Sequence, residues 1–210
     1  MAAIAPAHKV ASRHAGLVRV THWITTLCFL ALLVSGVEIL ISHPRFYWGE
    51  SGNVLTPALF TIPIPASRAT FPTRFGYVLP DQNGWSRYLH FQTAWIAVIT
   101  GMIYVIYGFL NGHFRAGFAG YNLVQRLTYL FVIFVLFPLV IWTGLAMSPA
   151  IAAAMPGAVT LLGGQQSART MHFFVSAFLF LFLLVHVTMV CRAGFRDRMR
   201  GMITGRSSTQ

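Results

Sequence analysis

The segment MHFFVSAFLFLFLLVHVTMVC, residues Met171 to Cys191, decides the fold. Its length is close to the roughly 20 apolar residues that a helix needs to cross the hydrocarbon core of a bilayer. It carries no charged residue, but it contains two histidines, His172 and His186, fourteen residues apart. On an α-helix this spacing returns to within about 40° of the same face and rises about 21 Å. The segment therefore predicts a transmembrane helix with one imidazole near each membrane surface, where polar side chains are usually functional.

Composition places the whole chain among membrane proteins. Of its 210 residues, 56% are hydrophobic and 9% are charged, and the mean hydropathy is +0.67, which is typical of that class. A formal net charge of +11 would indicate nucleic acid as the partner of a soluble protein. Here the basic residues flank apolar segments, where they set topology and contact anionic lipid. We expect a single domain over residues 1–210 that has membrane lipid, and no nucleic acid, as a partner.

Four apolar segments predict an all-α membrane protein, a bundle of four transmembrane helices. The predicted spans are residues 22–41, 90–110, 127–147 and 172–191, with a long proline-rich outer loop over 42–86, a second loop over 148–171 and a basic tail. Ten of the fifteen Lys and Arg residues lie on the side that holds both termini. Because basic residues accumulate on the cytoplasmic side, both termini are predicted to be cytoplasmic.

Alternating spans sort four histidines into two levels. His90 and His172 lie at the outer level, and His22 and His186 lie at the inner level. Two imidazoles that face each other suit an iron porphyrin, which brings four ligands of its own, whereas zinc alone usually needs three or four from the protein. We predict two haems with the axial pairs His90/His172 and His22/His186. Iron with both axial positions filled favours electron transfer over chemistry on a substrate.

Arginine precedes histidine by three residues three times. The pairs are Arg19/His22, Arg87/His90 and Arg169/His172. Residues three apart share a helix face, so each guanidinium is predicted one turn nearer the surface, where it can pair with a haem propionate. For Arg19, a topology signal explains the residue equally simply.

Two glycines follow the ligands at helical spacing. Gly36 is fourteen residues after His22, and Gly101 is eleven after His90. Each returns to nearly the face of its histidine at the level of the other haem, where a missing side chain leaves room for a flat macrocycle. Packing of small residues between helices explains the same pattern.

Several motifs resemble a known family. RVTHW (Arg19 to Trp23), His90 and the His172/His186 pair resemble the four-helix b-type cytochrome subunits of bacterial nickel–iron hydrogenases, formate dehydrogenases and thiosulfate reductases. HPRFYWG (His43 to Gly49) and GHFR (Gly112 to Arg115) are most similar to thiosulfate reductase cytochrome b. The resemblance implies an inner-membrane protein with two haems b, a quinone pocket and a periplasmic molybdopterin oxidoreductase of the sulfite oxidase or thiosulfate reductase type as partner.

The expected function is electron transfer between the quinone pool and a periplasmic enzyme. His113 and Asn111, near the inner haem level, are candidates for binding the quinone. One alternative is a stand-alone superoxide:quinone oxidoreductase, in which basic residues of the outer loop attract the anion. A second alternative is a non-redox membrane protein whose histidines bind metal or protons.

Overall fold

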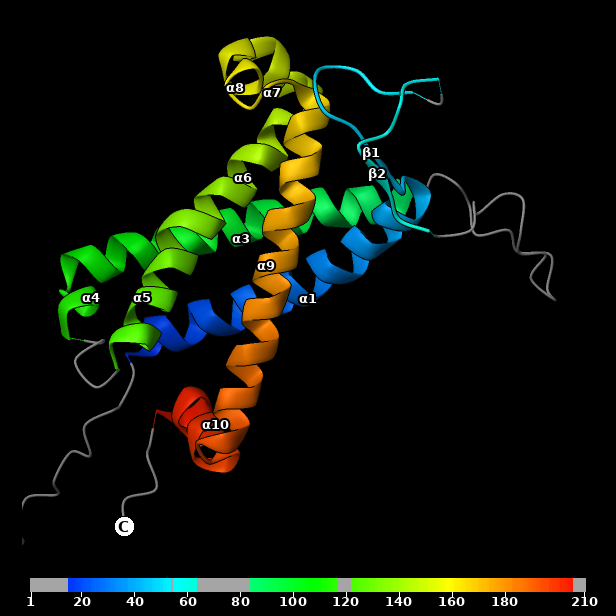
Figure 1. The fold of residues 1–210 in the computed structure, drawn as a ribbon. Coiled ribbons are helices and arrows are strands. Elements are labelled where there is room, and N and C mark those ends of the chain that lie inside the picture. Colours follow the sequence, from blue (N-terminus) through cyan, green and yellow to red (C-terminus); the bar gives the residue numbers. More distant parts are fainter. Residues whose placement is uncertain (1–14, 54, 64–83, 117–121, 206–210) are drawn as a thin grey trace, which may run out of the picture.

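Four long apolar helices form the protein. The computed structural model describes residues 15–53, 55–63, 84–116 and 122–205 of the 210-residue chain. The four helices are α1 (Gly16–Ser42), α3 (Gly84–Leu110), a composite helix (Leu123–Ala146) and α9 (Gln165–Arg192). Each is long and apolar enough to cross a membrane, and a helix satisfies its own backbone hydrogen bonds in lipid. The predicted all-α four-helix membrane fold is confirmed (Figure 1).

The helices extend beyond the predicted spans. Each begins at least one turn before the start that the apolar segments indicated. The prediction counted apolar residues only, whereas helical hydrogen bonding continues through polar residues at the membrane surface. As a result, Arg19, Arg87 and Arg169 lie near the starts of the same helices that carry the histidines.

The helices associate mainly as two pairs. α1 packs along α3, and α6 (Phe137–Ala146) packs along α9. A buried cluster joins the third span to α9, and Phe29 of α1 packs against it. The members of this cluster are Val132, Leu136, Val175 and Leu179. The largest fully buried side chains are those of serine and threonine residues, while many large apolar side chains are exposed. This distribution is expected when the surrounding solvent is lipid.

The third span contains a π-helical turn. Between α5 (Leu123–Phe131) and α6 lies η1 (Val132–Leu136), and the N–H that closes it donates to the Val132 carbonyl from five residues later. Pro138 is the second residue of α6. It lacks an N–H, and its ring would clash with the carbonyl four residues earlier in a regular α-helix. A wider turn is a common way to accommodate such a break without ending the helix.

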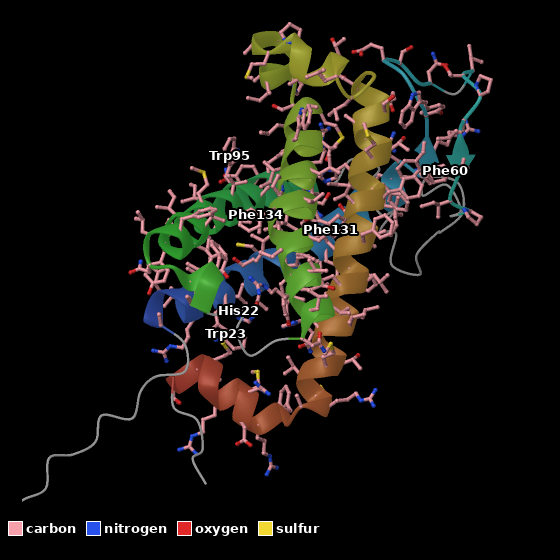
Figure 2. The ribbon with its side chains drawn as sticks, turned by 60° about the vertical axis from the view of Figure 1, so that its left-hand side comes forward. His22, Trp23, Phe60, Trp95, Phe131 and Phe134 are labelled. Carbon is pink, nitrogen blue, oxygen red and sulfur yellow. The ribbon has the colours of Figure 1, made fainter. Side chains whose placement is uncertain are left out.

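The described part of the first outer loop folds against α9. β1 (Arg45–Phe46) pairs antiparallel with β2 (Phe60–Thr61). The buried Phe46 ring has its centroid 4.6 Å from those of Phe60 and of Phe173 on α9. Figure 2 shows Phe60 beside α9. Residues 64–83 of the predicted loop lie outside the described residues.

The same loop caps the first turn of α9. The N–H groups of Gln166 and Ser167 donate to the Gly49 carbonyl at 3.0 and 3.2 Å. In return, the Gly49 N–H donates to Ser167 Oγ at 2.8 Å, and Thr170 Oγ1 donates to the Tyr47 carbonyl at 2.7 Å. These N–H groups lack acceptors within their own helix. The loop thus satisfies them and is held over the end of the helix that carries two predicted ligands.

Short helices replace parts of two segments predicted as irregular. The second loop contains α7 (Pro149–Ala154) and α8 (Pro156–Thr160), and the basic tail forms α10 (Phe195–Thr204). A fourth short helix, α4 (His113–Ala116), follows α3. Proline begins α7 and α8, where its missing N–H costs nothing. The loop prediction was therefore wrong at these positions, because proline breaks a helix interior but is accepted in the first turn.

Candidate functional site

The four membrane histidines meet in two pairs. The ring centroids of His90 on α3 and His172 on α9 are 6.3 Å apart. Those of His22 on α1 and His186 on α9 are 6.4 Å apart. Because one helix carries a member of each pair, the two pairs are separated by about 21 Å along α9. The structure brings together the pairs that membrane depth predicted.

The distance within each pair fits two ligands of one metal. A metal–nitrogen bond is about 2.0–2.1 Å, and the centre of an imidazole lies about 1.1 Å behind its coordinating nitrogen. Two rings on opposite sides of one metal therefore have centroids about 6.3 Å apart. Among the described residues, no group of three or more His, Cys, Asp or Glu could hold a metal ion. A porphyrin, which supplies the remaining ligands, suits these pairs.

Two buried hydroxyls orient the outer pair. Ser35 Oγ lies 3.0 Å from His90 Nδ1, and Thr143 Oγ1 lies 3.0 Å from His172 Nδ1. Each hydroxyl also donates to a carbonyl of its own helix, at 2.7 Å for Ser35 and 2.8 Å for Thr143. A hydroxyl has one hydrogen to donate, so it must accept from the imidazole Nδ1–H. We assign the Nδ1–H tautomer to both histidines, which leaves each Nε2 lone pair free for a metal.

A glycine follows each of these hydroxyl residues and lies beside the same ring. A Cβ at Gly36 would lie 3.6 Å from Cε1 of His90, and a Cβ at Gly144 would lie 3.3 Å from Cε1 of His172. Gly36 was predicted at this level, whereas Gly144 was missed. The signal available in the sequence was the repeated dipeptide of hydroxyl residue and glycine, Ser35–Gly36 and Thr143–Gly144. A Cβ at Gly101 would have no neighbour within 4 Å among the described residues.

The inner pair has a different environment. Tyr129 Oη lies 3.5 Å from His186 Nδ1, at the limit of a hydrogen bond. The Phe182 ring stacks on His186 with a centroid distance of 5.8 Å. Trp23 meets His22 edge-on at 5.4 Å, and Figure 2 shows these two side chains close together on α1. The inner level is thus more aromatic than the outer level and has a longer polar contact.

The outer arginines gather near the end of α1. Arg169 donates to the His43 carbonyl, and its guanidinium lies 5.1 Å from the centre of the Phe46 ring. Burial lowers the pKa of His43, and the positive charges of Arg169 and Arg87 lower it further. Burial is the larger cause of the lowered pKa, and the charges of the two arginines act in the same direction.

Three other predicted residues, Arg19, His113 and Asn111, make contacts outside the histidine pairs. Arg19 Nη1 donates to the Ile203 carbonyl of α10 at 2.9 Å, a partner that the sequence did not suggest. His113 meets the Tyr104 ring edge-on at 5.9 Å. Asn111 Nδ2 donates to the Tyr107 carbonyl at 3.1 Å and so caps the end of α3.

Comparison with known proteins agrees with this geometry. The prokaryotic cytochrome b561 family matches residues 13–205, nearly the whole chain. A protein of Azospira oryzae named "Putative protein-methionine-sulfoxide reductase subunit YedZ1" is 26% identical over an alignment of length 207, and the match covers 84% of this chain and 89% of that protein. No solved structure matches the chain. The chain belongs to the prokaryotic cytochrome b561 family and is a multi-pass b-type cytochrome subunit of the bacterial inner membrane that binds haem b.

Proposed function

We propose that this cytochrome holds two haems b and passes electrons between the quinone pool and a periplasmic oxidoreductase. The proposal rests on two pairs of imidazoles, which lie at two levels along α9. The ring centroids are 6.3 Å apart in the outer pair and 6.4 Å apart in the inner pair. A haem held at each level would supply one-electron transfer. In this proposal both termini of the protein lie in the cytoplasm, because the distribution of basic residues predicts that orientation.

The protein contributes ligation, orientation and exclusion of substrates. His90 and His172 hold the outer group, and His22 and His186 hold the inner group. Because two histidines would hold each haem, each site would favour electron transfer over reaction with a substrate. Ser35 and Thr143 fix the orientation of the outer imidazoles, so the ligands need little rearrangement when the charge at the centre changes.

We place Arg87 and Arg169 toward the outer propionates, because each lies on the same helix as an outer histidine and three residues before it. We assign the quinone to the region of His113 and Asn111.

The partner is proposed to be a periplasmic molybdopterin oxidoreductase of the sulfite oxidase or thiosulfate reductase type. The name of the Azospira oryzae relative, a subunit of a methionine-sulfoxide reductase, supports sulfoxide reduction as the reaction that consumes the electrons. The basic residues at the outer surface would attract an acidic docking face.

A haem count on the purified chain tests the proposal. Two haems b per chain are expected, with two one-electron steps in a redox titration. His172→Ala should remove the outer haem and keep the inner one, and His186→Ala should do the reverse. One haem per chain, or retention of both haems by His172→Ala, would reject the two-level arrangement. Reduction of quinone by superoxide with the isolated chain would instead support the stand-alone enzyme.

A further inference from the structure

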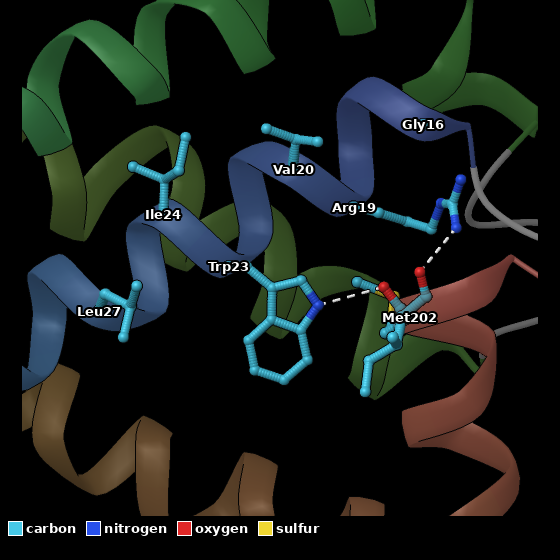
Figure 3. A pocket seen from close by; sticks show the side chains of 8 residues that line it. Gly16, Arg19, Val20, Trp23, Ile24, Leu27 and Met202 are labelled. Carbon is cyan, nitrogen blue, oxygen red and sulfur yellow. Dashed lines mark hydrogen bonds between the residues drawn. The ribbon is translucent and has the colours of Figure 1, made fainter.

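A cleft of about 400 Å³ opens between the first half of α1 and α10. Figure 3 shows it from close by, with the side chains of α1 on one side and Met202 on the other. After four spans, the start of α1 and the end of α9 lie at the same membrane surface, and α10 follows α9 directly. The cleft therefore lies where the bilayer interior meets the headgroups.

One wall of the cleft is an apolar stripe. Val20, Ile24 and Leu27 follow one another at helical spacing on α1, and their side chains are 58%, 37% and 67% exposed. Ile203 of α10, 60% exposed, lines the opposite side. From Val20 to Leu27 the stripe is about 10 Å long, a suitable bed for part of an acyl chain.

The other end of the cleft is cationic. Arg19 Nη1 donates to the Ile203 carbonyl at 2.9 Å, and Trp23 Nε1 donates to the Met202 carbonyl at 3.1 Å. These two bonds tie α10 to α1. A guanidinium has five N–H donors. Among the described residues the Arg19 guanidinium makes one hydrogen bond, from Nη1 to the Ile203 carbonyl, so its other Nη N–H groups retain capacity for an anionic oxygen.

The cleft is separate from the inner histidine pair. On a helix at about 100° per residue, His22 points roughly 165° away from the centre of the stripe formed by Val20, Ile24 and Leu27. The imidazole faces His186 on α9, while the stripe faces α10 and the outside of the bundle. A ligand in the cleft would therefore touch the helix that carries His22 without entering the space between the imidazoles.

We propose that this cleft binds one anionic phospholipid of the bilayer, with its phosphate at Arg19 and one acyl chain along Val20, Ile24 and Leu27. Charge complementarity favours an anionic lipid in the cleft, because α10 carries three basic residues, Arg196, Arg198 and Arg200, and one acidic residue, Asp197. Such basic helices at a membrane surface attract anionic lipid. The bound lipid bridges α1 and α10 and so steadies the turn that precedes His22.

The test is lipid retention by the haem-loaded full chain, measured by native mass spectrometry from nanodiscs. The probes are phosphatidylglycerol and phosphatidylcholine, with equal acyl chains. The wild-type chain should retain one phosphatidylglycerol in preference to phosphatidylcholine. Arg19→Gln should lower that retention roughly fivefold, the usual contribution of one basic residue near an anionic surface. Arg192→Gln, which removes the same charge at the same surface outside the cleft, should retain the lipid as the wild type does.

A second variant and a competitor test the acyl chain. Ile24→Trp fills the stripe without changing charge and should lower retention of phosphatidylglycerol, while glycerol phosphate should not displace the lipid. Equal losses in Arg19→Gln and Arg192→Gln would overturn the proposal. So would loss of haem with unchanged lipid in Arg19→Gln, which would assign Arg19 to a propionate. Displacement of the lipid by a quinone at equal concentration would also overturn it, because the cleft would then select a neutral ring.

Discussion

Removal of the Thr143 hydroxyl should change the outer haem selectively. Thr143→Val preserves the shape of the side chain but deletes the oxygen that lies 3.0 Å from His172 Nδ1. An acceptor at Nδ1–H makes an imidazole a more basic ligand, which favours the oxidised metal. Loss of this acceptor should therefore raise the reduction potential of the outer haem.

The magnitude of this effect follows from the neighbouring groups. A buried donor left without a partner costs about 1–3 kcal/mol. The carbonyl of Val140 also lies near the His172 ring and can take over part of the bond, so we expect the lower end, about 1 kcal/mol. For a one-electron couple, a tenfold change in the equilibrium constant corresponds to about 59 mV. A free-energy change of about 1 kcal/mol therefore limits the rise in the reduction potential of the outer haem to about 40 mV.

Redox potentiometry of the purified variant measures the shift, with the two haems assigned from the His172→Ala spectrum. Thr143→Ser keeps the hydroxyl and should restore the wild-type potential. Thr188→Val serves as a matched control, because its hydroxyl also donates to a helix carbonyl, at 2.8 Å, on an exposed face. An unchanged outer potential in Thr143→Val, or an equal shift in Thr188→Val, would refute the assignment of the tautomer.

Four further substitutions test the surroundings of the site. Gly144→Ala should lower the outer haem content, because its Cβ would lie 3.3 Å from the nearest imidazole carbon, whereas Gly36→Ala, at 3.6 Å, should keep it; equal haem contents would contradict this. Tyr129→Phe removes a contact of 3.5 Å, and it should shift the inner potential by less than half of the outer shift above. Ser167→Ala leaves the Gly49 N–H without its 2.8 Å acceptor, a loss of about 1–3 kcal/mol. Hydrogen exchange of the outer loop should then accelerate, and an unchanged exchange rate would argue against the cap.

The sequence by itself determines the fold class and the level of each histidine. A bilayer core of fixed thickness requires about 20 apolar residues per span, and consecutive spans alternate in direction. Depth in the membrane therefore follows from position along the chain. For this reason the pairs His90/His172 and His22/His186 can be predicted without knowledge of any contact, and the structure brings the same pairs together.

Only the tertiary structure decides what surrounds each ring. Ser35 reaches His90 across 55 positions of the chain, and Thr143 reaches His172 across 29. Arg19 turns toward α10. These contacts depend on the rotation of each helix about its axis and on its neighbours in the plane of the membrane. Side-chain packing between distant segments sets both, and the hydropathy pattern of a single span carries no information about either.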